Sequence, residues 1–522
     1  MIPTLRRGMA LRFLAALSAA CMPSLRAGAA ERIGYHEVRT DGRGLLVPWY
    51  GTGPSQAYDH VIRRVWDFWI TMRPCPNGVP YYLLHQVWKA DQDDPRGLGG
   101  DQLCMALSSW NLLYAYTGDP AVRDNMRLMA DYWIGHGLAA EDLPWGGLPY
   151  PYNLDNASGR YDGDMRAGPG FLQPDKAASF GAELVMLYKA TGERRYLERA
   201  VRIADRLAHN AVPGDGENSP WPFRVNAATG AVHEERNDRD HRVRRASYTT
   251  NWTGALRLFD ELAALGEGHP EAYRACSSRV TQWLKRYPMR TQRWGPFFED
   301  VSTKDDSDTE INADTLAAYL LEHPGWDPEW RARARAILDG SYATFANHDD
   351  ERWGAVSINE QTAYMEPGNS HTARHAAVEL LYAEKTGDWG ARDAAVRRLT
   401  WSTYWVAEDG RNQFPHDDIW LTDGYGDFVR HYLRAMASDP RLAPDDQDHL
   451  LRTSSVIRSI RYAKGSITFD VFDGQSEELF KLGASSPSGV KGGTLDWDRA
   501  SRVLWVHAHG RCVAVALGPR SP

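Results

Sequence analysis

Side chains that could transfer protons stand at the start of apolar helical segments. Residues 97–119 read GLGGDQLCMALSSWNLLYAYTGD, an apolar stretch whose predicted first turn carries Asp101 and Gln102. A second apolar segment begins in the same way, with Asp175 and Lys176. A positioned carboxyl group can donate or accept a proton in acid–base catalysis. Two such groups could flank one bond, as cleavage of a glycosidic bond requires.

Four further predicted helix starts also carry polar side chains. They are Tyr248 and Asn251 in SYTTNW, Glu310, Asn312 and Asp314 in TEINADT, Asn369 and His371 in PGNSHTARH, and Asp423 and Tyr425 in LTDGYGD. Helix capping is the competing interpretation for any single Asp, Asn or Ser at such a position. Tyr, His, Lys and Gln are poor caps, so the whole pattern favours helix starts that meet at one cavity.

Hydrolysis by paired carboxylates is the first functional hypothesis. Asp101 and Asp175 are the predicted catalytic pair, with Asp175 as the acid. Lys176 and a helix N-terminus would both lower the pKa of Asp175, so an acid there needs burial or a second carboxylate. Aromatic rings in the connecting loops could stack on a sugar. The predicted substrate-binding residues are Gln102, Lys176, Asn251, Trp252, Trp145, Trp420, Asp423 and Tyr425.

Two other functions fit the same residues. A lyase that eliminates across a uronic acid needs a neutralised substrate carboxylate, a base and an acid. Asn251, His371 and Tyr248 fit those parts by type. The carboxylate could be held by Lys176, Arg242, Arg244, Arg245 or Arg374. The second alternative is a protein that binds a saccharide without catalysis, which applies if Asp101 and Asp175 lie too far apart to serve one bond.

Helical periodicity recurs along most of the chain and positions these residues. The predicted helices are residues 58–72, 100–117, 120–138, 175–191, 194–210, 248–265, 270–287, 312–322, 328–347, 370–386, 390–406 and 423–438. Similar joints connect them, such as LLYAYTGD, MLYKATGE and LLYAEKTGD, with turn glycines at 118, 192, 266, 325 and 387. Glycine suits a left-handed C-cap, and recurrence of the joint indicates a repeated helical hairpin.

The helices alternate in character, which predicts the fold class. Segments that are apolar on most faces should be buried, and segments with a charged stripe should be peripheral. Six of each predict an all-α (α/α)6 toroid over residues 57–440, with an open solenoid as the alternative. Residues 441–522 read as a small C-terminal β-sheet module, and residues 30–56 as an N-terminal extension that could add an edge strand or two.

With these hairpins in place, the chain resembles the six-hairpin glycosidase superfamily, which includes unsaturated glucuronyl hydrolases and uronate-polysaccharide lyases. The resemblance covers about residues 58 to 438 and rests on the hairpin count and the joints. It implies an active site at the N-termini of the buried helices. In the glucuronyl hydrolase branch it implies two aspartates on successive inner helices, where Asp101 and Asp175 stand. The His-Asp-x-Gly-Phe signature of that branch is absent, since Asp101 follows Gly100.

Composition restricts the partners and the compartment. Residues 1–29 carry Arg6 and Arg7, an apolar stretch and a small-residue site, which predicts an export signal and a periplasmic or secreted protein. Removal of that segment changes the formal charge from -8 to -12, which argues against nucleic acid as a partner. We expect an oligo- or polysaccharide substrate, with uronic-acid-containing saccharides among the candidates, and no membrane span, no cofactor and no metal. Four scattered cysteines remain, without metal-ligand spacing.

Overall fold

The computed structural model describes residues 31–518 except 299–300, 303, 305–306, 364, 415–417 and 484, and it does not describe the side chains of residues 100, 102, 422 and 423. The predicted export signal, residues 1–29, lies outside the described residues. Residues 32–522 group as one compact unit. None of the described helices is long and apolar enough to cross a lipid bilayer.

The twelve predicted helices are all present. They are α1 (Pro54–Thr71), α2 (Gly100–Thr117), α3 (Pro120–His136), α4 (Pro174–Thr191), α5 (Arg194–Asn210), α6 (Thr253–Leu265), α7 (Pro270–Arg286), α9 (Glu310–Glu322), α10 (Trp330–Phe345), α11 (Asn369–Thr386), α12 (Arg392–Thr403) and α13 (Phe428–Ser438). A short α8 (Pro288–Thr291) follows α7, and a π-helical turn, Thr422–Asp427, precedes α13. α6 begins five residues later than predicted, so Tyr248 and Asn251 lie in the loop before it.

Four of the five predicted glycine joints are left-handed helix caps. Gly118, Gly192, Gly266 and Gly387 end α2, α4, α6 and α11 with φ between 70° and 79°. The prediction was wrong at Gly325, because α9 ends at Glu322 with His323 as its C-cap, and Gly325 lies inside a 3-10 turn, Pro324–Trp326. Proline at the first position of that turn fixes the chain direction there without a left-handed residue.

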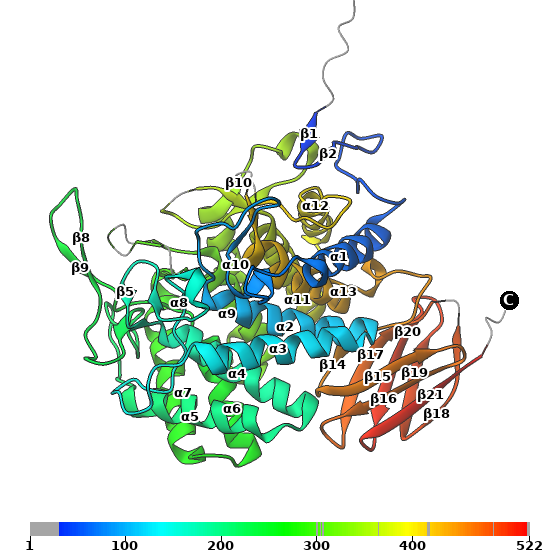
Figure 1. Cartoon of the computed structure of the whole chain (residues 1–522). Helices are drawn as coiled ribbons and strands as arrows, with labels where there is room; N and C mark the ends of the chain where they lie inside the picture. Colours follow the sequence, from blue (N-terminus) through cyan, green and yellow to red (C-terminus); the bar gives the residue numbers. More distant parts are fainter. Residues whose placement is uncertain are drawn as a thin grey trace, which may run out of the picture. The chain divides into compact units, whose positions relative to one another are not determined.

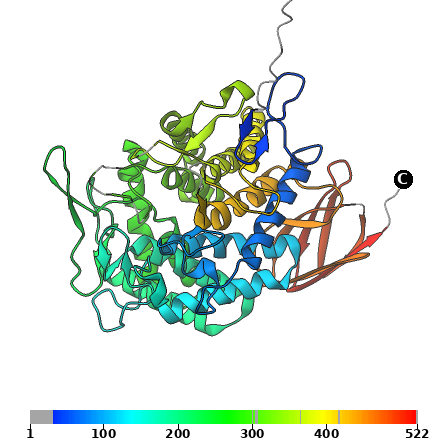
Figure 2. The same ribbon diagram turned by 45° about the horizontal axis from the view of Figure 1, so that its top comes forward.

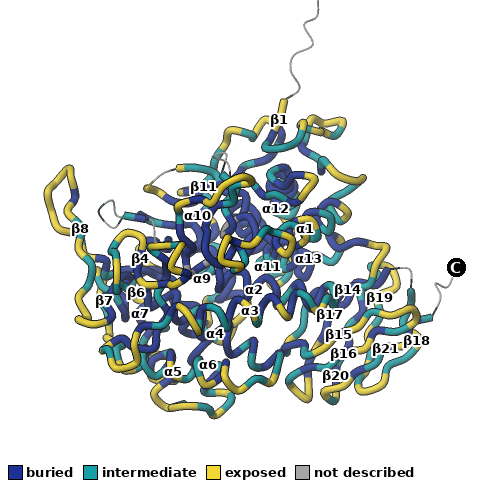
Figure 3. Tube along the Cα trace, in the orientation of Figure 1, coloured by how far each residue is buried: buried dark blue, intermediate teal, exposed yellow. Residues whose placement is uncertain are grey.

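Alternate helices form an inner set whose contacts close on themselves. α2 contacts α4, α4 contacts α6, α6 contacts α9, α9 contacts α11, α11 contacts α13, and α13 contacts α2. The intervening helices pack outside, as α5 does on α4 and α12 on α11 (Figure 2). Residues of the inner helices are buried along most of their length (Figure 3). All-round apolar composition thus separated inner from outer helices correctly.

The C-terminal region is a pair of four-stranded antiparallel sheets (Figure 1). One sheet has the order β14 (His449–Thr453), β17 (Ser476–Lys481), β20 (Val503–Ala508), β19 (Gly493–Asp498). The other has the order β15 (Ile457–Ala463), β16 (Ser466–Val471), β21 (Cys512–Gly518), β18 (Ser486–Lys491). β14 contacts α2 and α13, so the end of this strand lies against the inner helices. The domain limits themselves remain a prediction.

A two-stranded sheet lies near the start of the described chain, and the four described cysteines form no disulfide. β1 (Arg32–Ile33) pairs with β2 (His36–Glu37) near the start of the described chain. Cys75, Cys104 and Cys276 are buried and Cys512 is exposed, and all four are free thiols.

Candidate functional site

A cavity of about 530 Å³ receives side chains from all six inner helices or from the loops before them. Its lining includes Asp101 of α2, Lys176 of α4, Asn251 before α6, Asp314 of α9, Arg374 of α11 and Arg430 of α13. Five of these residues are nine-tenths or more buried, and Arg430 is partly buried. Of the polar residues predicted at helix starts, Asp101, Lys176, Asn251 and Asp314 therefore line one cavity.

Asp101 and Asp314 stand on opposite walls of this cavity. α2 and α9 are separated by two inner helices in either direction of the cyclic contact order. Asp101 is 2% exposed and Asp314 is fully buried, and both line the cavity. Asp101 does not cap α2, because the N-cap position belongs to Gly99, which has no side chain. The two carboxyl groups thus face a shared space from two sides.

Asp175 occupies a different place from the one expected for a catalytic acid. It is fully buried and is absent from the described cavity lining. Its Oδ2 accepts hydrogen bonds from Lys176 Nζ at 2.8 Å and from Asn251 Nδ2 at 2.9 Å. Lys176 also donates to the Phe297 carbonyl oxygen and lies 3.6 Å from the centre of that ring. Asp175 therefore positions two residues that do reach the cavity.

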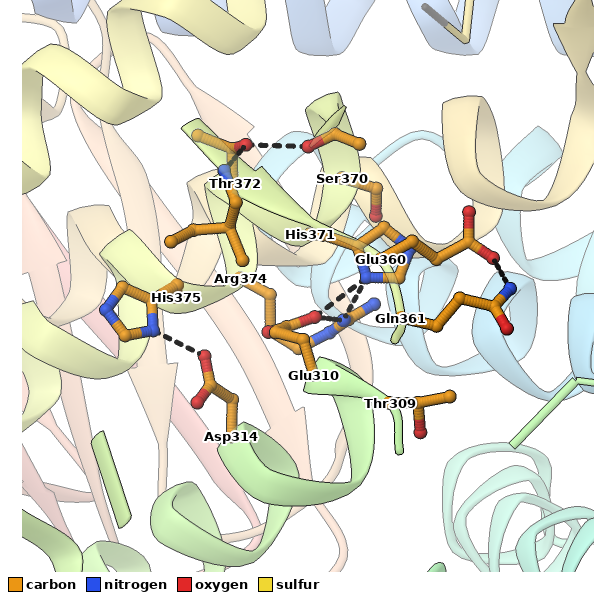
Figure 4. Close-up of polar contacts among 12 residues, drawn as sticks. Thr309, Glu310, Asp314, Glu360, Gln361, Ser370, His371, Thr372, Arg374 and His375 are labelled. Carbon is orange, nitrogen blue, oxygen red and sulfur yellow. Dashed lines mark hydrogen bonds and ion pairs between the residues drawn. The ribbon is translucent and has the colours of Figure 1, made fainter. Parts of the chain in front are cut away.

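Asp314 on α9 supplies the second wall, with Glu310 one turn before it (Figure 4). The two buried carboxyl groups influence each other's pKa. Burial raises the pKa of Glu310 well above its usual value, and the Asp314 charge adds to this effect. Burial also acts to raise the pKa of Asp314, but His375, with Nδ1 2.7 Å from Asp314 Oδ2, lowers it on balance. The raised pKa of Glu310 and the lowered pKa of Asp314 make Asp314 the more acidic of the two groups.

Arg374 connects this pair to the neighbouring helix α13. Its Nη1 donates to Glu310 Oε2 and its Nη2 to Asp427 Oδ2. His371 Nδ1 lies 2.7 Å from the same Glu310 oxygen (Figure 4). Burial and the Arg374 charge lower the pKa of His371 well below its usual value. His371 is therefore a neutral partner behind Glu310, and it is absent from the described cavity lining.

Asp427 is the anchor of the basic residues on α13. It accepts from Ser370 Oγ at 2.6 Å and from Arg430 Nε at 2.7 Å. Burial acts to raise the pKa of Asp427, yet Arg374, Arg430 and His431 together bring it well below its usual value. Burial lowers the pKa of His431 to about 3, against the opposing effect of Asp427. His431 thus lines the cavity as a neutral imidazole, with the Asp427 carboxylate behind it.

The remaining predicted residues lie elsewhere or outside the description. Tyr248 donates its OH to the Arg293 carbonyl at 2.9 Å, and Trp252 donates its Nε1 to the Thr249 carbonyl at 2.7 Å. Trp145, Tyr248, Trp252, Trp420 and Tyr425 are absent from the described lining of this cavity. The backbone of Gln102 and Asp423 is described but their side chains are not.

The segment from Trp294 to Phe298 lies over the N-terminal ends of α6 and α9. Asn312 Nδ2 donates to the carbonyl oxygens of Trp294 and Gly295 at 3.0 Å, and Thr249 Oγ1 donates to that of Pro296 at 2.7 Å. Phe297 and Phe298 of this segment form an apolar cluster with three other residues, and we call this cluster the plug. The other members are Met105, Val301 and Ile311. The helix-start residue Asn312 thus anchors a covering loop.

Exposed residues of the cavity lining lie at its other end. These residues are Glu322, His323 and Ser454, at the C-terminus of α9 and after β14. We expected the opening at the N-terminal face of the inner helices. Among the described residues, the plug lies at that face, and Asn312 and Thr249 bind carbonyl groups of the loop that carries it.

Solved structures of two sugar epimerases and an isomerase share this fold. The chain is similar to a sugar epimerase from a ruminal bacterium, at 14% identity and a TM-score of 0.53, over 72% of this chain and 98% of that chain. A cellobiose 2-epimerase from Bacillus thermoamylovorans B4167 gives 12% identity and 0.52, over 72% and 98%. A D-mannose isomerase gives 10% and 0.52, over 74% and 99%. These similarities show a shared fold, in agreement with the fold that the resemblance implied.

Sequence comparison adds no relative to these. No protein-family model matches the chain, and no curated protein matches it significantly.

Proposed function

We propose that the chain is a carbohydrate-active enzyme, an (α/α)6 toroid that cleaves a glycosidic bond by acid–base hydrolysis. The cyclic contacts of the inner helices support the toroid. The observation that carries the reaction is the placement of Asp101 and Asp314 on opposite walls of one buried cavity. Two carboxyl groups that flank the scissile bond are the usual requirement for this chemistry.

The two carboxyl groups take different roles because their surroundings differ. Burial acts to raise the pKa of Asp314, but His375 lowers it on balance, so Asp314 is the carboxylate that acts as the base and activates water. Asp101 then donates a proton to the leaving oxygen from the opposite wall. Lys176 and Asn251, both held by Asp175, present donors to sugar hydroxyls beside Asp101. Asp314 replaces Asp175 in the pair expected from the sequence.

Substitution of the two carboxylates tests the roles. Asp101→Asn and Asp314→Asn should each lower kcat by roughly 10² to 10⁴, the usual worth of a positioned acid or base. The measurement is release of new reducing ends from a panel of neutral and acidic glycans. Asp124→Asn is the control, since the Asp124 side chain is 73% exposed on α3. Equal activity in all three variants would remove the proposed pair.

Interconversion of a small reducing sugar is the second candidate. A cavity of about 530 Å³, covered on one side by the plug, suits a short saccharide better than a long polymer. The structures with the same fold include two epimerases and an isomerase. This reaction would exchange a carbon-bound proton with D2O and create no new reducing end, so the same assays separate it from hydrolysis.

The lyase alternative has less support. It assigned acid and base roles to Tyr248 and His371, which are absent from the described cavity lining. Elimination would produce an absorbance near 235 nm with uronic-acid polysaccharides, and hydrolysis would not. A protein that only binds saccharides would give no product in any of these assays.

We also propose export to the periplasm or medium, on the basis of residues 1–29. The mature protein should then begin close to Ala30, which N-terminal sequencing of exported material would check.

A further inference from the structure

The catalytic cavity continues into a second chamber at the C-terminal ends of the inner helices. This chamber has a volume of about 400 Å³ and shares Glu183, Arg257, Glu322 and Arg434 with the first. Thr453 and Ser455, at and just after the end of β14, line both. The chamber belongs neither to the Asp101–Asp314 pair nor to the plug.

Three guanidinium groups lie at this end of the cavity: Arg257 and Arg434 line both chambers, and Arg430 lines the first. Arg430 and Arg434 lie one turn apart on α13, and Arg257 lies on α6. α6 and α13 are separated by two inner helices in either direction, so Arg257 faces Arg430 and Arg434 across the cavity. Like charges four residues apart on a helix repel each other. Glu183 offsets the charge of Arg257 and Asp427 that of Arg430, so a bound anion would chiefly offset the charge of Arg434.

The three groups differ in their existing partners. Arg257 Nη1 donates to Glu183 Oε1 at 3.0 Å, and Arg430 Nε donates to Asp427 Oδ1 at 2.7 Å. Arg434 has no hydrogen bond or ion pair with any residue that the structure describes, although it is partly buried and lines both chambers. Burial lowers the pKa of Arg434, and the charge of Glu322, which is exposed at the cavity end, acts to raise it. The guanidinium donors of Arg434 are therefore available to an oxyanion that enters the chamber.

We propose that Arg434, supported by Arg257 and Arg430, binds an oxyanion group such as the carboxylate or sulfate of an acidic saccharide. A planar guanidinium recognises either group through two parallel hydrogen bonds. Thr453 and Ser455 line the same end, but their hydroxyls already donate to Glu478 and Asp473, so the guanidinium groups supply the donors. The assignment of the oxyanion to a saccharide rests on the proposed function. Binding of the oxyanion itself does not, because it requires no catalysis.

Calorimetric titration of the mature full-length protein tests the site. The probes are sodium glucuronate, sodium sulfate and glucose, at constant ionic strength set with chloride. We expect glucuronate or sulfate to bind the unsubstituted protein. Glucose, which carries no charge, should show the same binding signal with the unsubstituted protein and with Arg434→Gln. Arg434→Gln should weaken oxyanion binding roughly tenfold or more, the usual effect of losing a charge-assisted pair. Preference for glucuronate over sulfate would identify a sugar acid as the ligand, and the reverse preference a sulfate ester.

Two controls keep this test separate from folding and from catalysis. Arg434→Gln should melt at or above the temperature of the unsubstituted protein, because it removes repulsion without breaking a described bond. Asp314→Asn should retain oxyanion binding while it loses turnover. Equal oxyanion binding by Arg434→Gln and the unsubstituted protein, or no binding to either, would overturn the site. Loss of turnover with binding retained would leave it standing.

Discussion

At the scale of single residues, contact with the cavity and existing hydrogen-bond partners decide which buried carboxylates remain chemically available. Asp175 has a lysine and an amide on one oxygen and no place in the described cavity lining. Asp314 lines the cavity and has a histidine behind it. Sequence reasoning found Asp101, Lys176 and Asn251 from their positions at helix starts. It could not rank Asp314 above Asp175, because both precede an apolar helical stretch and only packing distinguishes them.

The buried pair of Asp175 and Lys176 leads to a stability prediction. Asp175→Asn leaves the Lys176 ammonium, 1% exposed, without its counter-ion. Breaking one side of a buried ion pair costs about 3 to 5 kcal/mol, so the variant should unfold at lower temperature and lower denaturant concentration. The double variant Asp175→Asn/Lys176→Met should recover part of this loss, because no buried charge remains.

Thermal and urea denaturation would measure both variants against Asp124→Asn. A melting temperature for Asp175→Asn that matches the exposed control would show that the pair contributes nothing to the fold.

At the scale of elements, the periodic pattern predicted the helices and the joints predicted the hairpins. The pattern had no information on the loop from Trp294 to Phe298, because its position depends on hydrogen bonds from Asn312 and Thr249 to its carbonyl groups. The exposed residues of the cavity lining lie at the C-terminal end of α9 and after β14, whereas we expected them at the N-terminal ends of the inner helices. The role of Arg434, inside α13, could not be predicted either, since a lone arginine in a helix usually faces solvent.

Left-handed caps give a prediction for the helical joints. Gly192 ends α4 at φ 79° with open space where a Cβ would lie, so only backbone strain opposes a side chain there. Gly192→Ala should cost about 1 to 2 kcal/mol of folding stability. Gly325→Ala is the matched control, because it has open space and no left-handed backbone. Differential scanning calorimetry should show a lower melting temperature for the first variant alone, and equal effects would contradict the assignment.

At the scale of the whole molecule, buried ionisable groups couple stability to pH. The pKa of His431 is lowered to about 3 in the fold, and an exposed histidine has a pKa near 6.5. Below pH 6.5 the unfolded chain therefore binds a proton that the folded chain does not, and stability falls as pH falls from about 6.5 towards 3. His371 acts in the same direction. Glu310 opposes them above about pH 4.3, since its pKa is raised in the fold.

His431→Gln isolates one of these contributions. The unsubstituted protein should lose up to about 1.4 kcal/mol more per pH unit than this variant between pH 6 and pH 4. Denaturant titrations at a series of pH values would measure the difference. Parallel pH profiles for the two proteins would show that His431 is not held neutral in the fold.

The account depends most on two carboxyl groups that act on one sugar from opposite walls. Hydrolysis of a glycan panel in water enriched with oxygen-18, followed by mass spectrometry, tests this directly. We predict one heavy oxygen in the new reducing end, with the label lost in Asp101→Asn and Asp314→Asn and retained in Asp124→Asn. Absence of labelled product from every glycan, or undiminished labelling in the Asp101 and Asp314 variants, would contradict it.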